Sequence, residues 1–172
     1  MSLSRPIIAL MLAACASTPP PRPAAVPEEL RVPDGQQLLL RAAARGAQIY
    51  TCKAKAADRA AFEWVLKAPE AELFDESGAK IGRHYAGPTW ESADGSRVVG
   101  EVMQRSPVQG AVPWLLLRAK SNEGTGAFAS VKYIQRVDTA GGIAPSAGCD
   151  AAHAGAEASV YYSANYHFYG AR

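Results

Sequence analysis

The sequence predicts an all-β domain, an antiparallel sandwich or barrel of about 8–10 short strands built from hairpins. Apolar and polar residues alternate with a period of two, most clearly in the aromatic-rich run 160–169. Turn signals recur at short intervals, and Asp94-Gly95 is the strongest of them. The third observation is that the chain shows no long helical period and no internal repeat. Together these patterns favour a chain that folds back on itself strand by strand.

Residues 1–14 have the features of a lipoprotein signal peptide. Arg5 is the sole charge among them, and it precedes the apolar run 6–14. As a helix this run spans about 14 Å, which is too short for the ~30 Å core of a bilayer. It ends in Leu-Ala-Ala-Cys at 12–15, which resembles a bacterial lipobox and implies cleavage before Cys15. The alternative is an ordinary signal peptide that happens to carry a cysteine.

Residues 15–33 are expected to be the lipidated cysteine and a proline-rich linker. A diacylglycerol on the Cys15 thiol and an acyl chain such as palmitate on its amine give stable membrane anchoring. Six prolines lie between residues 17 and 33, a composition that favours an extended spacer over a core. No acidic residue follows Cys15 directly. By analogy with lipoprotein sorting, we therefore expect a bacterial cell-envelope protein, with the outer membrane favoured.

Residues 34–172 form the predicted single β domain. The first expected strand, 38–45, has a short helix as its alternative. Turn signals such as Gly87-Pro88 and Gly141-Gly142 separate the later segments. The expected strands are 38–45, 47–52, 62–67, 72–75, 80–85, 89–92, 97–103, 112–120, 128–136 and 160–169.

Once Cys15 is assigned to lipid, Cys52 and Cys149 remain. Two lone thiols in an oxidising envelope compartment usually pair, so we expect a disulfide between them, 97 residues apart (149 − 52). A cysteine nucleophile or a metal site is the alternative, but the sequence places no activating base near either cysteine. No histidine pairs with a cysteine or carboxylate at metal-ligand spacing, and we expect neither a metal nor a cofactor.

The charge balance excludes one class of partner. Lys and Arg total 18 and Asp and Glu total 16, which gives a formal net charge of +2. A mixed, nearly neutral chain without a basic run does not predict nucleic-acid binding.

The best candidate binding site is the turn from His84 to Glu91. It combines a base, two aromatic rings, a hydroxyl and a carboxylate, groups that suit stacking on a sugar ring or planar ligand. The alternative is a tight Gly-Pro corner whose His and Trp pack structurally. A second polar loop with the same alternatives contains Asp138. The candidate ligand-binding residues are His84, Tyr85, Trp90, Glu91, Trp114 and Asp138.

The run Gly124–Ala129 fits a dinucleotide-binding fingerprint but lacks its context. That fingerprint needs a following helix whose N-terminus meets phosphate, whereas the residues after Ala129 are typical of a strand. We expect a glycine-rich hairpin turn. The sequence also contains no nucleophile elbow, no P-loop and no zinc-binding His-Glu-x-x-His helix.

Several separate motifs give the chain a family resemblance. The chain resembles the family catalogued as domain of unknown function 3455 from about residue 34 onward. The resemblance implies a secreted or surface-associated protein and brings no established activity or catalytic residue. The motifs are Gly46–Cys52, His84–Trp90, Pro113–Leu117, Ile134–Gly142, Cys149-Asp150 and Tyr162–Tyr169.

The functional expectation is an envelope lipoprotein whose domain is a non-catalytic module that binds a glycan or another small ligand. The first alternative is an envelope hydrolase with His84 as general base and Glu91 or Asp138 as its partner. The second is a structural or assembly lipoprotein that acts through a flat surface. The absence of catalytic motifs favours the binding module.

Overall fold

The structure is a computed structural model that describes residues 25–171. The predicted signal peptide, Cys15 and the first part of the linker lie outside the described residues. The described part contains eight strands, two short 3-10 helices and no α-helix, which confirms the all-β class. Within it, no helix is long and apolar enough to cross a membrane.

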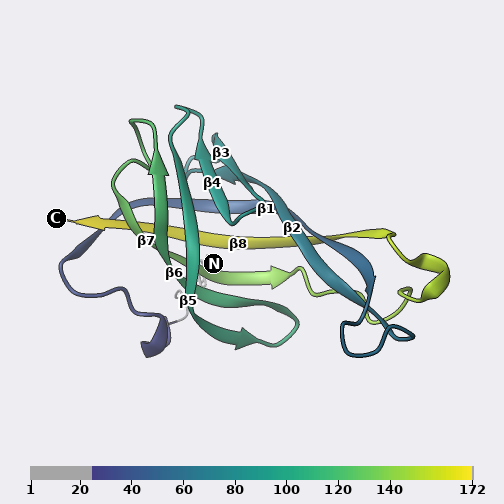
Figure 1. Ribbon diagram of the computed structural model, residues 1–172. Coiled ribbons are helices and arrows are strands. Elements are labelled where there is room, and N and C mark those ends of the chain that lie inside the picture. Colours follow the sequence, from purple (N-terminus) through teal and green to yellow (C-terminus); the bar gives the residue numbers. More distant parts are fainter. Residues whose placement is uncertain (1–24, 172) are drawn as a thin grey trace, which may run out of the picture.

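All strand pairs are antiparallel, and each strand pairs with its neighbours in the chain. The last strand also pairs with the first, so that the strands form a closed barrel (Figure 1). The strands are β1 (Gln36–Ala54), β2 (Phe62–Phe74), β3 (Lys80–Tyr85), β4 (Thr89–Ser92), β5 (Arg97–Val108), β6 (Ala111–Glu123), β7 (Val131–Gly141) and β8 (Glu157–Ala171), and the 3-10 helices are η1 (Glu28–Leu30) and η2 (Ala151–His153).

The ten predicted segments become eight strands because two pairs of them merge. Segments 38–45 and 47–52 are both part of β1, so the helical alternative for 38–45 is wrong. Segment 62–67 and residues 72–74 of segment 72–75 are both part of β2, which ends at Phe74. Gly46 joins the two halves of β1: a Cβ there would lie 2.1 Å from the Glu70 carbonyl oxygen of β2. The glycine thus permits a close strand approach rather than ending a strand.

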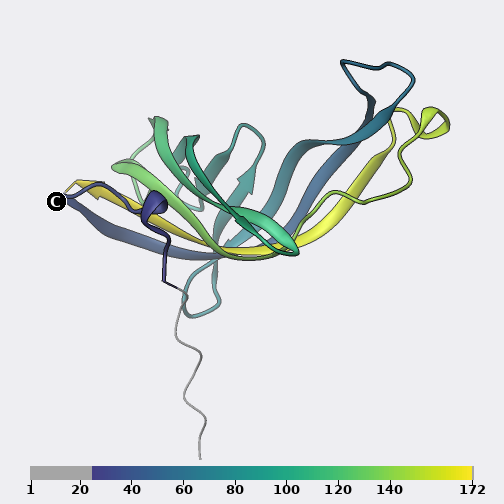
Figure 2. The ribbon, with the colours of Figure 1, turned by 90° about the horizontal axis from the view of Figure 1, so that it is seen from below.

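The strands differ in length, and this divides the molecule into two regions. Strands β1, β2 and β8 continue together beyond the barrel into a curved three-stranded ribbon (Figure 2). We call this ribbon, residues 50–54, 62–66 and 157–159, together with the loop 142–156, the extension. A bulge in the β1–β2 pairing between Ile49 and Tyr50 marks its start.

The barrel interior holds the main hydrophobic core. Alternate residues of β8 point into it, as the sequence predicts, and Phe168 is completely buried. Phe128 packs against Phe168 with ring centroids 4.7 Å apart, although it belongs to the turn before β7 rather than to the predicted strand 128–136. The turn 124–130 leads into a strand, which confirms that Gly124–Ala129 is a hairpin turn.

The extension is held differently. Cys52 and Cys149 form the predicted disulfide, with Cα atoms 5.3 Å apart. Two side chains bind the same loop: the Tyr50 hydroxyl donates to the Gly142 carbonyl at 2.6 Å, and the Trp64 indole donates to the Ala147 carbonyl at 2.9 Å. These contacts fasten the loop 142–156 to the ribbon.

The segment before β1 is fixed to the side of the barrel. Leu30 of η1 is completely buried, and its carbonyl accepts a 2.6 Å hydrogen bond from the Gln135 side-chain amide of β7. Gln135 alternates with the inward residues Ile134 and Arg136, so this attachment is on the outer face of the sheet.

Candidate functional site

The hairpin of β3 and β4 positions the centre of the candidate site. His84 and Trp90 are direct cross-strand partners, and their rings stack with centroids 4.4 Å apart and planes 10° apart. The corner between them depends on Gly87, whose φ of 84° is in the left-handed region. The Thr89 hydroxyl closes the corner by donating to the Ala86 carbonyl at 2.9 Å. The predicted turn therefore places His84 and Trp90 together, on the barrel side of the sheet.

The state of the His84 ring follows from its surroundings. Its Nδ1 lies 2.9 Å from the Thr89 carbonyl oxygen, which can only accept a hydrogen bond. Nδ1 therefore carries the proton, and Nε2 of the neutral ring is an acceptor. Burial lowers the pKa of His84 to about 3, and the charge of Arg136 acts in the same direction. The ring is uncharged at neutral pH.

A cavity of about 270 Å³ lies inside the barrel beside this stack. Its size is near the lower end of the ~300–1,000 Å³ range of small-molecule sites. Apolar side chains form much of the wall, with a few polar ones among them. No acidic residue takes part. The lining residues are Gln48, Leu66, Lys67, Ala68, Pro69, His84, Gly87, Pro88, Trp90, Val102, Arg105, Leu115, Leu117, Arg136 and Tyr166.

Arg136 is held in the cavity wall by an interruption of the β6–β7 ladder beside it. Pairing skips from Ala111 to Leu115 of β6, around Pro113, which has no N–H to donate. The free Pro113 carbonyl instead accepts hydrogen bonds from Nε and Nη2 of Arg136, at 3.1 and 2.8 Å. The neighbouring Val112 carbonyl accepts from the Thr139 hydroxyl at 2.6 Å. A local break in the sheet therefore fixes a guanidinium inside the barrel.

The charge of Arg136 acts on several phenols of the interior. Burial raises the pKa of Tyr50, Tyr162 and Tyr166, and the positive charge of Arg136 opposes that rise at all three. Arg136 forms no ion pair within 4.0 Å among the described residues. The interior thus contains a cation whose counter-charge is not supplied by residues 25–171.

Two cavity-lining side chains carry buried nitrogen atoms without a hydrogen-bond partner. They are the amide nitrogen of Gln48 and the indole nitrogen of Trp90, and both can only donate. The Tyr166 hydroxyl differs, because Arg136 and Tyr162 interact with it and oppose the rise of its pKa on burial. Buried polar groups in proteins are normally paired, so such a concentration beside one cavity indicates a place where a ligand or water completes the bonding.

Tyr85 and Glu91 lie apart from the cavity. Glu91 pairs across the hairpin with Arg83, and this pair is adjacent to the His84–Trp90 pair. Because successive side chains of a strand point to opposite faces, Glu91 lies on the face of the sheet opposite to His84. The Tyr85 hydroxyl donates to Glu91 at 2.7 Å, and Arg83 binds both Glu91 oxygens at 3.0 and 3.1 Å. The Tyr85 hydrogen bond and then Arg83 hold the pKa of the Glu91 carboxyl below its usual value. Arg83, Tyr85 and Glu91 therefore form a cluster whose members bind one another.

Trp114 and Asp138 are also separate from the cavity. Trp114 is half-buried, and its indole nitrogen has no hydrogen-bond partner among the described residues. Asp138 has a φ of 50° at an irregularity in the β7–β8 pairing, where it accepts a 3.1 Å hydrogen bond from the Asn165 amide. Neither residue contacts His84 in the described part of the chain. The structure therefore places two of the six candidates, His84 and Trp90, at one cavity.

Sequence reasoning missed Gln48, Tyr166 and Arg136 as site residues. A signal existed for Gln48, because it occupies an inward position of a strand that otherwise points Ala44, Tyr50 and Cys52 inward. A polar residue at a core position is a useful pointer to a lined cavity. Arg136 gave a similar signal, because it lies two residues after the inward residue Ile134 in a predicted strand.

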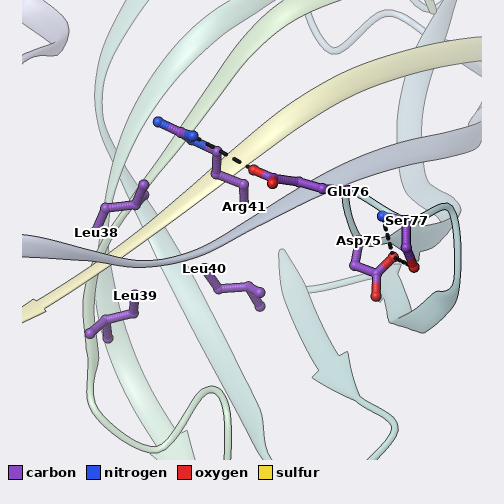
Figure 3. Close-up of a pocket in the computed structure, with 7 residues that line it drawn as sticks. All are labelled: Leu38, Leu39, Leu40, Arg41, Asp75, Glu76 and Ser77. Carbon is purple, nitrogen blue, oxygen red and sulfur yellow. Dashed lines mark hydrogen bonds and ion pairs between the residues drawn. The ribbon is translucent and has the colours of Figure 1, made fainter.

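A second depression, between β1 and the β2–β3 turn, has no comparable organisation. Figure 3 shows Leu38 and Arg41 on one side of β1 and Leu39 and Leu40 on the other. Arg41 forms an exposed ion pair with Glu76 at 3.6 Å. Because the labelled side chains do not converge on one point, we do not assign a site there.

The fold and the cavity define a class: a closed antiparallel β barrel with a disulfide-linked extension and a cavity lined by apolar and a few polar side chains. The chain belongs to the family described as "Protein of unknown function (DUF3455)", whose family model matches residues 33–170. This confirms the family that the motifs indicated. No curated protein and no solved structure matches the chain.

Proposed function

We propose that this protein is an envelope lipoprotein whose barrel is a non-catalytic module that binds a small organic ligand in its interior cavity. The observation that carries the proposal is the cavity itself, lined by the His84–Trp90 stack and by buried polar atoms without partners. A concave, mostly apolar site with a few placed polar groups is the usual form of a small-molecule site.

The size and burial of the site favour a small molecule over a glycan chain. Trp90 has an exposed fraction of 1% and His84 of 3%, so neither ring offers an open platform for a polymer. The cavity of about 270 Å³ suits a ligand of one or two rings.

The membrane anchor rests on the sequence. The support is the apolar run that ends in Leu-Ala-Ala-Cys at 12–15 and the proline-rich linker that follows. We propose lipidation at Cys15 and, from the residues after it, an outer-membrane location.

The geometry gives less support to the hydrolase alternative. Within the described residues, the hydrogen bond recorded for His84 is to a backbone carbonyl, and no carboxylate lies within salt-bridge distance of it. A pKa of about 3 also makes the ring a weak base at neutral pH. We therefore place His84 in a binding role.

A binding experiment tests the cavity. The full chain, purified in detergent, is titrated with small neutral aromatic compounds such as indole and benzamide, with tryptophan fluorescence and ligand-observed NMR as readouts. Ala68→Leu introduces a larger side chain into the cavity wall and should abolish binding, whereas Ala60→Leu in an exposed loop should not. Unchanged binding to Ala68→Leu would show that the cavity is not the site.

Intact mass tests the anchor. Protein isolated from membranes of its native host should have the mass of residues 15–172 plus acyl chains. A mass that begins at Met1, or one without lipid, would remove the lipoprotein part of the proposal and leave the cavity proposal standing.

A further inference from the structure

We infer that the ligand of the barrel cavity is an organic monoanion, a compact apolar body with a single carboxylate-type group that binds Arg136. This inference rests on the proposed function and adds the chemical class of the ligand. Three independent features of the cavity lead to it: its charge, its hydrogen-bonding groups and the shape of its cation.

The charge of the cavity is positive. Its lining includes Lys67, Arg105 and Arg136 and no carboxylate. Glu157 neutralises Lys67 at 2.6 Å, but neither arginine has an acidic partner within 4.0 Å in the described residues. Arg105 is exposed and Arg136 is half-buried, so Arg136 is the more desolvated of the two cations. A cation held in a partly desolvated wall is unfavourable unless an anion joins it.

The unpaired N–H groups of the cavity also suit an anion. Gln48 and Trp90 each have an N–H group without a partner. A ligand rich in donors would leave these N–H groups unpaired, whereas an oxyanion accepts from several donors at once. These two N–H groups therefore favour a ligand that supplies an acceptor.

The shape of the cation selects one oxyanion geometry. Arg136 uses Nε and Nη2 on the Pro113 carbonyl, and a guanidinium has five N–H donors in a planar fork. The remaining N–H groups of Nη1 and Nη2 form a second edge, and a carboxylate can accept two parallel hydrogen bonds from this edge. The same cavity is also lined by the apolar residues Val102, Leu115 and Leu117, which suit the non-polar body of the same molecule.

Matched pairs of probes test the inference. We would titrate benzoate against benzamide, indole-3-acetate against indole-3-acetamide, and hexanoate against hexanamide, with inorganic phosphate as a bare oxyanion. Each pair differs mainly in charge. At least one carboxylate should bind at least tenfold more tightly than its amide, and it should also bind more tightly than phosphate.

Variants locate the effect. Arg136→Gln should abolish the preference for carboxylate, and Arg136→Lys should retain part of it because charge remains but the fork is lost. Lys132→Gln, on the same strand and exposed, should leave the preference unchanged. If Arg136→Gln fails to fold, Arg105→Gln removes the other cation without touching the β6–β7 ladder and should weaken carboxylate binding severalfold.

The outcomes separate the two proposals. Equal binding of acids and amides, with both lost in Ala68→Leu, would overturn the anion inference and leave the binding module intact. If phosphate bound as tightly as the organic acids, the inference that the ligand has an apolar organic body would be wrong. No binding of any probe to the wild-type chain would overturn both.

Discussion

The extension continues three of the eight barrel strands, β1, β2 and β8, yet the barrel and the extension are stabilised in different ways. The barrel encloses a core that includes Trp90, Tyr166 and Phe168, with a lined cavity beside it. The extension has no opposing layer, and its buried side chains are Tyr50 and Cys52. In place of a core it has a disulfide and two side-chain hydrogen bonds to one loop. The comparison shows that cross-links can replace packing where a sheet has only one layer.

The largest expected effect is loss of the disulfide. By the chain-entropy estimate, a bridge that spans 97 residues stabilises the fold by about 4–5 kcal/mol. Urea denaturation of the double variant Cys52→Ala/Cys149→Ala should show a free energy of unfolding that is lower by a large part of this amount. Hydrogen exchange should show the loss of protection concentrated in residues 50–54 and 62–66, with the barrel core still protected. Uniform loss of protection would contradict the division into two regions.

Truncation of the aromatic core should give the next effect. Phe168→Ala removes a completely buried ring that packs against Phe128 and should cost about 3–5 kcal/mol. Tyr161→Ala on the same strand is the matched control, because Tyr161 has an exposed fraction of 64% and should change stability by less than about 0.5 kcal/mol. Similar values for the two variants would show that β8 does not direct alternate residues into a core.

A pH-dependent effect should come from His84 in the barrel. Its pKa is about 3 in the folded chain against 6.5 in an unfolded one, so between these values the unfolded chain binds the additional proton. Stability is therefore lost as pH falls below about 6.5, by roughly 2 kcal/mol between pH 7 and pH 5.

The variant His84→Asn isolates this contribution, because its amide can still donate to the Thr89 carbonyl but does not titrate. Urea unfolding at both pH values should show a smaller decrease for the variant than for the wild-type chain. An equal decrease would assign the pH dependence to other groups, such as half-buried His167, whose pKa burial also lowers.

The smallest expected effect is on ligand binding, and it distinguishes the turn at Gly87 from the turn at Gly78. Gly87→Ala and Gly78→Ala each place a Cβ at a φ near 84°, without a contact shorter than 3.6 Å, and should each cost about 1–2 kcal/mol. Only Gly87 lines the cavity. Calorimetric titration with the best probe should therefore show weaker binding for Gly87→Ala than for Gly78→Ala at similar stability.

Much of the fold was predictable because local patterns determine it. The strand over 89–92 and the alternation along β8 follow directly from period-two patterning and turn residues. The merging of strands at Gly46 was not predictable, because a glycine that permits close strand approach has the same local sequence as one that ends a strand.

The candidate site was predictable only in part, for a physical reason. His84 and Trp90 are neighbours across a short hairpin, so their proximity is local information. Gln48 and Arg136 reach the same cavity from strands far apart in the chain. Non-local convergence of this kind depends on barrel closure, which one sequence does not specify.

The pairing of β1 with β8 also has a consequence for the time course of folding. It joins residues as distant as Gln36 and Ala171, so the ring cannot close until the final strand is available. Contacts this far apart in sequence form slowly, because a long loop must be closed before they contribute. A chain that emerges N-terminus first from a ribosome or a transport channel therefore exposes an open sheet edge until its last residues are free.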